Sequence, residues 1–163
     1  MAETARPFQL EPAESLPEAN PSIADDDAKH YWLLSNGRSW KLSLGQNIGK
    51  VPPEIFAARS GVLFVGLYHG SAASISPEDG RIIDRAKLIR GNMVYWGDYD
   101  DLIVAVGEVE IGVFDLDGKL LWRAALGDVI DEIKLDQGVF QLTDVSGETG
   151  RYEARTGRIV SSD

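Results

Sequence analysis

Short apolar runs separated by polar turns recur along the chain from Tyr31 onward. The strongest runs cover residues 62–65, 102–106 and 139–142, and a turn-like pair precedes each of them: Ser60-Gly61, Asp100-Asp101 or Gln137-Gly138. Runs of this length, with no apolar positions repeating at a helical spacing, are typical of strands. The pattern therefore predicts a series of short antiparallel strands.

A glycine turn marks the same point in each part of this series. A small polar residue, a glycine and a base follow one another at Asn36-Gly37-Arg38, Asp79-Gly80-Arg81, Asp117-Gly118-Lys119 and Thr156-Gly157-Arg158. The four glycines are separated by intervals of 43, 38 and 39 residues. A large apolar residue lies five positions before each glycine: Trp32, Ile75, Val113 or Tyr152. Glycine supplies the positive φ that tight hairpin turns need, so each motif predicts a hairpin.

A further candidate strand precedes each strong apolar run, at residues 54–58, 93–96 and 131–135. Four short strands in about 40 residues are the signature of a β-propeller blade or a related β-repeat. We expect full repeats at residues 51–89, 90–127 and 128–163, preceded by two strands of an incomplete repeat at residues 30–48. The expected fold class is all-β: a repeat domain over residues 29–163, with about three and a half propeller-like, four-stranded repeats in an open or partial propeller.

The segment VFDLDGKLLWRA, residues 113–124, contains an apolar strand, a glycine turn and a Lys-aliphatic-aliphatic-Trp strand. It resembles the repeat of the pyrroloquinoline-quinone-dehydrogenase-like propellers, well over residues 113–123 and weakly over the three full repeats. The resemblance implies a propeller fold. Because no residue here matches a cofactor-binding motif, we expect no cofactor.

Closure of such a row of strands has several solutions. A propeller usually needs four or more blades, so three and a half repeats leave exposed sheet edges, which invite pairing. The edges could pair with a second chain, giving a homo-oligomer, or the repeats could collapse into a compact form. A third solution is that residues 1–28 cover an edge.

Residues 1–28 differ from the rest of the chain in composition. They contain four of the seven prolines. They also contain seven acidic residues, and their one basic residue is Arg6. Such a segment has too little apolar surface to offset its chain entropy, so we expect a disordered, acidic, proline-rich tail. Phe8 and Leu10 are a candidate anchor.

The charge balance narrows the classes of partner. With 26 acidic residues against 16 lysines and arginines, the net charge is −10. This disfavours nucleic acid and anionic membranes, which are polyanions, and favours a basic protein partner. The chain contains no cysteine, which excludes disulfides and thiol chemistry. The N-terminus lacks a basic segment followed by an apolar one, so a cytoplasmic location is expected.

The best candidate for a recognition loop is Tyr95-Trp96-Gly97-Asp98-Tyr99, which continues into Asp100 and Asp101. A second candidate loop contains Tyr68 and His69. Aromatic residues are favoured at the centres of protein interfaces, which supports a binding role for these loops. The alternative is that the large rings, including all four tryptophans, fill the spaces between sheets.

Catalytic and metal chemistry have weaker support. His69 lies near Ser71, but no nucleophile-elbow pattern surrounds them, so we predict no catalytic residue. The acids of residues 98–101 and 115–117 offer oxygen ligands, but an EF-hand register would place Val113 first and Ala124 last, where neither can ligate. We predict no metal site.

The leading hypothesis is therefore a non-enzymatic, protein-binding β-repeat module, such as an acidic inhibitor or immunity-type protein that masks a basic partner. The first alternative is a carbohydrate-binding or hydrolytic subunit that uses aromatic and acidic loops on one rim. The second is a propeller fragment that another chain completes.

Overall fold

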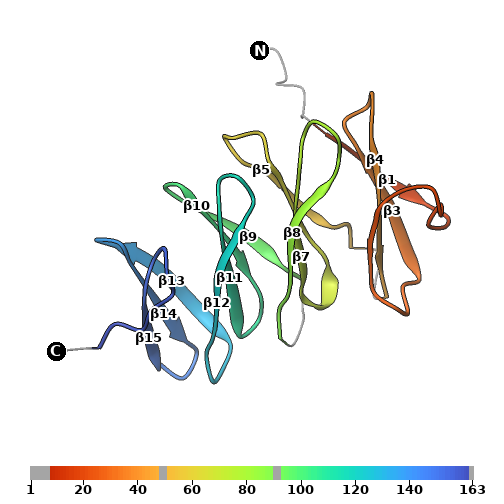
Figure 1. Ribbon diagram of the computed structural model, residues 1–163. Helices are drawn as coiled ribbons and strands as arrows, with labels where there is room; N and C mark the ends of the chain where they lie inside the picture. Colours follow the sequence, from red (N-terminus) through yellow and green to blue (C-terminus); the bar gives the residue numbers. More distant parts are fainter. Residues whose placement is uncertain (1–7, 48–50, 90–92, 162–163) are drawn as a thin grey trace, which may run out of the picture.

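The chain folds into four small sheets that lie side by side in a row (Figure 1). The computed structural model describes residues 8–47, 51–89 and 93–161. Sheet 1 has the order β1 (Gln9–Ala13), β3 (His30–Ser35), β4 (Lys41–Gln46), β2 (Ser22–Ala24). Sheet 2 has the order β5 (Glu54–Ala57), β6 (Leu63–Gly66), β7 (Ser71–Ile75), β8 (Ile82–Lys87).

Sheet 3 contains β9 (Tyr95–Tyr99), β10 (Leu102–Val106), β11 (Glu110–Asp115) and β12 (Leu120–Ala125), also in sequential order. Sheet 4 contains β13 (Ile130–Asp136), β14 (Val139–Asp144) and β15 (Thr149–Glu153), and a single bridge joins Tyr152 to Ile159 where a fourth strand was expected. Neighbouring strands are antiparallel, except that β2 is parallel to β4. The expected all-β, propeller-like arrangement is confirmed.

Along the strand direction, rather than along the row of sheets, the molecule has two distinct ends. The β3–β4, β7–β8 and β11–β12 turns, with Gly37, Gly80 and Gly118, lie at one end, which we call the turn end. The strands β4, β8 and β12 finish, and β5, β9 and β13 begin, at the opposite end, which we call the link end. Figure 1 shows the β7–β8 and β11–β12 turns at the top and the β12–β13 link at the bottom.

Three apolar layers hold the row together, one between each pair of neighbouring sheets. The first joins Trp32, Leu34 and Leu42 of sheet 1 to side chains of sheet 2, and the second is centred on Phe64 and Phe114. The third joins sheets 3 and 4 through side chains that include Val104, Val113, Trp122, Phe140 and Leu142. Alternation along each strand explains this arrangement, because successive side chains point to opposite faces of a sheet.

Each of the two outermost faces of the row carries a polar cross-strand row. On sheet 4, the cross-strand row Lys134, Gln141 and Arg151 points away from sheet 3. On sheet 1, the corresponding row Gln9, Ser35 and Lys41 points away from sheet 2. Polar outer faces are a property of the capping units of repeat proteins.

The N-terminal segment differs from the expected disordered tail. Residues 1–7 lie outside the described residues, but β1 pairs with β3 over five positions and β2 pairs with β4. The incomplete repeat at residues 30–48 is thereby completed to four strands. The physical reason is that three apolar side chains of this segment, Phe8, Leu10 and Ile23, pack into the layer between sheets 1 and 2.

Candidate protein-binding surfaces

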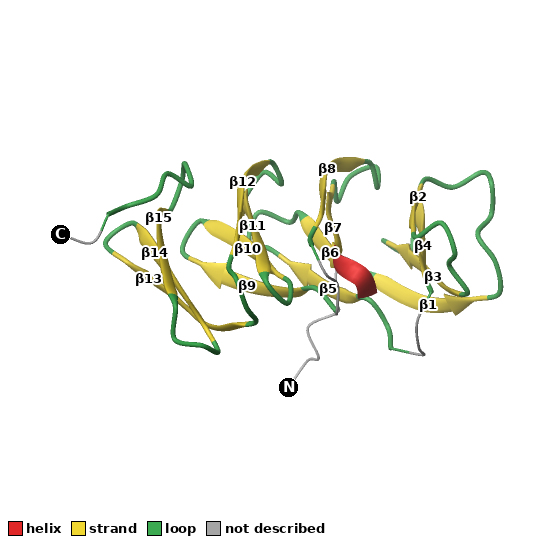
Figure 2. Ribbon diagram, turned by 90° about the horizontal axis from the view of Figure 1, so that it is seen from below, coloured by secondary structure: helices red, strands yellow, loops and turns green. Residues whose placement is uncertain are grey.

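The predicted recognition loop is a strand. Residues 95–99 form β9, which pairs with β10 from Tyr95 opposite Val106 to Tyr99 opposite Leu102. β9 is an edge strand of sheet 3, and Figure 2 shows it on the same side of the row as β5 and β13. The prediction of a loop at these residues is therefore wrong, because every residue of the segment pairs with a residue of the apolar strand β10.

Two of the predicted aromatic side chains belong to the core. The Trp96 ring lies 5.1 Å from the Phe64 ring and 5.8 Å from the Phe114 ring, between sheets 2 and 3. The Tyr99 ring meets the Phe140 ring edge-on at 5.3 Å, between sheets 3 and 4, and burial raises the pKa of the Tyr99 hydroxyl. These rings fill the space between sheets, as the sequence alternative stated.

The predicted acidic residues lie toward the turn end. Asp98 is exposed on β9, Asp100 occupies the β9–β10 turn with a φ of 58°, and Asp101 forms an ion pair with Arg155 of sheet 4. Asp101 thus links two sheets. Among the described residues, no group of three or more metal-ligating side chains gathers at a point.

Tyr68, His69 and Tyr95 lie at the link end instead. Tyr68 and His69 belong to the short 3-10 turn η1 (Tyr68–Gly70) between β6 and β7, and the backbone N–H of Tyr68 donates to Oε1 of Gln46 at 2.9 Å. At about 3.3 Å per residue along β9, Tyr95 is roughly 16 Å from Asp100. The predicted site residues therefore divide between the two ends and form no single site.

The link end carries a surface that the sequence patterns did not reveal. Of the six large apolar side chains that are exposed among the described residues, five lie here: Val51, Ile89, Tyr95, Val129 and Val145. They come from sheets 2, 3 and 4, and the backbone N–H of Val145 donates to the carbonyl of Val129 at 2.9 Å. The sixth, Ile159, bridges to Tyr152 on β15. We call the five residues the link-end patch.

Acidic side chains surround the link-end patch. Exposed or half-buried carboxylates there belong to Glu54, Glu108, Asp128 and Glu148. Two described bases at this end are paired: Lys87 Nζ lies 3.0 Å from Asp25 Oδ1, and Arg123 lies 2.8 Å from the buried Glu110. Lys29 is a further exposed base at this end, and Lys50 and Arg90 are the sequence neighbours of Val51 and Ile89. The four carboxylates thus contribute negative charge beside the patch, together with these bases.

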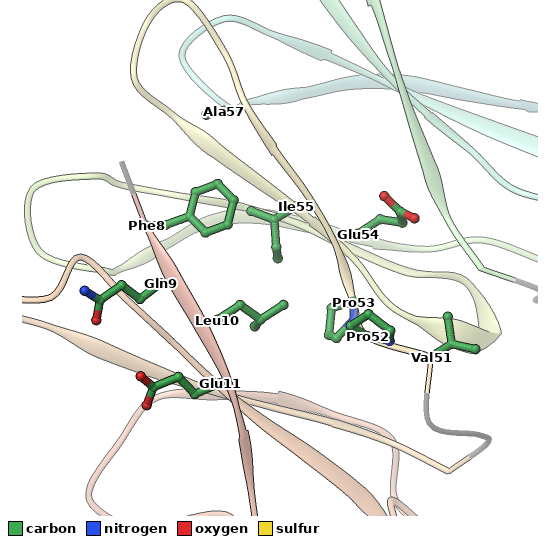
Figure 3. A pocket seen from close by; sticks show the side chains of 10 residues that line it. All are labelled: Phe8, Gln9, Leu10, Glu11, Val51, Pro52, Pro53, Glu54, Ile55 and Ala57. Carbon is green, nitrogen blue, oxygen red and sulfur yellow. The ribbon is translucent and has the colours of Figure 1, made fainter. Parts of the chain in front are cut away.

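A groove separates sheets 1 and 2 beside the patch. It has a volume of about 950 Å³, and the strands β1 and β5 form its two walls (Figure 3). Phe8 and Leu10 of β1 face Ile55 of β5 across it, and Val51, Pro52 and Pro53 close it toward the link end. Val51 thus lines the groove and also belongs to the link-end patch. Phe8 and Leu10 were expected as an anchor, and no sequence signal paired them with Ile55.

Comparison with known proteins supports the fold. The chain matches no protein-family model, and no curated protein matches its sequence. BamB from Moraxella catarrhalis, a propeller of the pyrroloquinoline-quinone-like type, is similar over 95% of this chain and 51% of its own, with 15% identity and a TM-score of 0.50.

Two computationally designed proteins, Ika4 and Ika8, are also similar, each with a TM-score of 0.50. Ika4 is 11% identical, over 71% of this chain and 74% of its own, and Ika8 is 10% identical, over 84% of this chain and 46% of its own. The chain therefore spans about half the length of BamB and of Ika8. At this identity the similarity shows the β-propeller type of fold.

The described residues include no helix with the length and apolar character that crossing a membrane requires. The conclusion from the fold and the comparisons is a β-repeat scaffold of the propeller type, with four stacked sheets and an apolar, acid-flanked surface at one end.

Proposed function

We propose that this chain is a non-enzymatic protein-binding module and that the link-end patch is its docking surface. The observation that carries the proposal is the clustering of five of six exposed large apolar side chains at one end of the row. Single exposed apolar residues are normal on any protein, but a group of them rimmed by polar residues is typical of an interaction site.

The extent of the patch favours a protein as the ligand. Packed sheets lie about 10 Å apart, so a patch that crosses sheets 2, 3 and 4 extends over roughly 20 Å. This span fits a protein surface better than a small molecule, which binds in a single concave pocket. Tyr95, with 58% of its surface exposed, is the one aromatic side chain in the patch and is the best candidate for an energetic anchor.

The charge around the patch supports a basic partner. Glu54, Glu108, Asp128 and Glu148 would face the partner's rim, where opposite charges raise the association rate and select against acidic competitors. In its finer form, the proposal is that the chain is an acidic inhibitor or immunity-type protein that masks a basic partner. The chain's net charge of −10 supports this form.

The test is a selection of binders followed by affinity measurements. A library of displayed protein domains is selected on the wild-type chain, and the dissociation constants of enriched binders are measured for wild type, Tyr95→Ser and Val145→Ser. Ile159→Ser is the matched control, because it also removes an exposed apolar side chain but lies outside the patch. We expect basic binders whose affinity falls about tenfold with either patch substitution, changes little with the control, and falls with added salt.

An absence of saturable binders, or binders equally affected by Ile159→Ser, would contradict the proposal. The carbohydrate alternative has less support, because the rings of Trp96 and Tyr99 pack between the sheets, and among the described candidate aromatics Tyr95 is the one with an exposed side chain. Saturable quenching of tryptophan fluorescence by oligosaccharides would favour that alternative.

A further inference from the structure

Sheet 1 differs from sheets 2 and 3 in the position of one strand. The strands β3, β7 and β11 are equivalent, because each leads into a turn glycine: Gly37, Gly80 or Gly118. Each of them pairs with its hairpin partner along one edge and with β1, β6 or β10 along the other edge. Sheets 2 and 3 add one more strand beyond this position, β5 or β9. Sheet 1 adds its fourth strand, β2, at the opposite edge, so β1 is an edge strand there.

The groove between β1 and β5 lies where sheets 2 and 3 have their additional strand. Its volume of about 950 Å³ is at the upper end of the range for ligand pockets, which is enough for a short extended peptide segment. Figure 3 shows Phe8 and Leu10 on one wall and Ile55 on the other, all directed into the groove. An edge strand that borders such a groove is the arrangement used when a peptide adds as a further strand.

The pattern of β1 defines what could be added. Leu10 belongs to the face that packs toward sheet 2, whereas Gln9 and Glu11 belong to the outward polar face. In a strand added beside β1, every second side chain would lie next to Leu10, on the face toward sheet 2, and would be apolar. The side chains between them would lie on the outward face, next to Glu11. The described lining contains no lysine or arginine. Its exposed carboxylate on β1 belongs to Glu11, whereas Glu54 points to the face of β5 opposite to Ile55 (Figure 3).

We infer that the groove binds an extended segment of a partner protein that alternates apolar residues with lysine or arginine, added to sheet 1 as a strand beside β1. The apolar side chains lie against Phe8, Leu10 and Ile55, and the basic ones lie near Glu11. Pro12 has no N–H to donate, so the added strand pairs mainly with the Gln9–Glu11 part of β1.

This inference rests on the proposed protein-binding function and names a second contact of the same partner. Val51 belongs to both the groove and the link-end patch, so the two surfaces are continuous. A partner that covers the patch can extend one strand into the groove without leaving the surface.

The probe is a fluorescein-labelled nine-residue peptide that alternates valine and lysine, at low micromolar concentration. The control peptide has the same composition with its valines and lysines in two blocks. We expect saturable binding of the alternating peptide, measured by fluorescence anisotropy, and binding of the block peptide about tenfold weaker or absent. Hydrogen exchange of the wild-type chain should slow at the β1 amides when the alternating peptide is present.

Glu11→Lys should weaken binding of the alternating peptide about tenfold at low salt, because it reverses the charge beside the basic side chains of the added strand. Glu78→Lys is the matched control, since Glu78 is an exposed acid in the β7–β8 turn at the other end, and it should leave binding within about twofold. Equal weakening by Glu11→Lys and Glu78→Lys, equal binding of both peptides, or protection confined to other strands would overturn the inference.

Tyr95→Ser separates this inference from the proposed function. It should leave binding of the nine-residue peptide unchanged while it weakens the selected protein binders. If the selected binders depend on Tyr95 but no peptide protects β1, the groove inference fails and the proposed function stands. A wild-type dimer that the peptide does not dissociate would also overturn the inference, because a second copy would then fill the groove.

Discussion

The indole Nε1–H of Trp122 in sheet 3 donates a 2.8 Å hydrogen bond to the backbone carbonyl of Ala154 in sheet 4. Trp40 in sheet 1 makes the same contact with sheet 2, donating to the carbonyl of Pro77 at 2.9 Å. Both acceptors lie three residues before a turn glycine, Gly157 or Gly80. The tryptophan is therefore a repeated device that fixes one sheet to the next.

Trp122→Phe should destabilise the fold by about 1–3 kcal/mol, because it leaves the Ala154 carbonyl without its indole donor while an aromatic ring remains in the layer. The measurement is the free energy of unfolding from urea denaturation, followed by circular dichroism. Trp40→Phe should have a similar effect through Pro77. No change in either variant would show that the indole contacts do not stabilise the interfaces.

Gly157→Ala should cost more stability than Gly138→Ala. Both glycines have positive φ, 69° and 75°, so an alanine at either position pays about 1–2 kcal/mol for a left-handed conformation. A Cβ at Gly157 would also lie 2.6 Å from the Trp122 ring, whereas a Cβ at Gly138 would meet nothing within 4 Å. Equal losses in urea denaturation would contradict the close approach of Trp122 to the turn.

The pH dependence of stability should include a contribution from Asp144. Hydrogen bonds from the side chain of Ser146 and from the backbone N–H groups of Glu148, Ser146 and Gly147 lower the pKa of this carboxyl. Because the pKa is lower in the folded state, the contribution is complete above the ordinary pKa of aspartate and is lost as the pH falls through the lowered value.

Ser146→Ala should raise the pKa of Asp144, because it removes the strongest of these hydrogen bonds. The measurement is a carboxyl titration by NMR, together with urea denaturation at acidic and neutral pH. Asp144→Asn, which cannot titrate, should reduce the loss of stability on acidification. An unchanged acid dependence in Asp144→Asn would refute this assignment.

The chain should be a monomer on size-exclusion chromatography with light scattering, over a wide dilution range. Polar rows on the outer faces of sheets 1 and 4 oppose stacking of one copy's outer sheet on another's. These rows are Lys134, Gln141 and Arg151 on sheet 4, and Gln9, Ser35 and Lys41 on sheet 1. A dimer that persists on dilution would favour completion of the propeller by another chain.

A triple variant tests the reason for this expectation. Lys134→Val, Gln141→Val and Arg151→Val together would give the outer face of sheet 4 an apolar row like those inside the molecule. This variant should associate at concentrations where wild type is monomeric. If this variant stays monomeric, the polar row on sheet 4 is not what prevents copies of the chain from associating.

The sequence alone determined the repeat. The spacing of Gly37, Gly80 and Gly118 predicted the β3–β4, β7–β8 and β11–β12 hairpins, because positive φ and tight turns are local requirements. Gly157 also has positive φ, but among the described residues only the single bridge between Tyr152 and Ile159 spans its turn. The apolar runs at residues 62–65, 102–106 and 139–142 predicted β6, β10 and β14. β6 and β10 are apolar throughout because other sheets cover both of their faces, whereas β14 alternates and places Gln141 on the outer face.

The tertiary structure decided everything that depends on contacts between distant residues. β1 and β2 exist because β3 and β4 offer them edges, and no local pattern in a proline-rich acidic segment predicts such pairing. In the sequence, Trp96 and Tyr99 lie in a segment with the composition of a binding loop. Their rings lie between sheets because sheet 2 packs on one face of sheet 3 and sheet 4 packs on the other.

The candidate surfaces are tertiary in the same sense. Val51, Ile89, Val129 and Val145 are single apolar residues in separate links, and only the shared direction of the strands gathers them at one end with Tyr95. The groove needs Phe8 and Ile55 to face each other from different sheets. A sequence specifies turns and strands through local conformational preferences, whereas a surface depends on which elements the packing brings together.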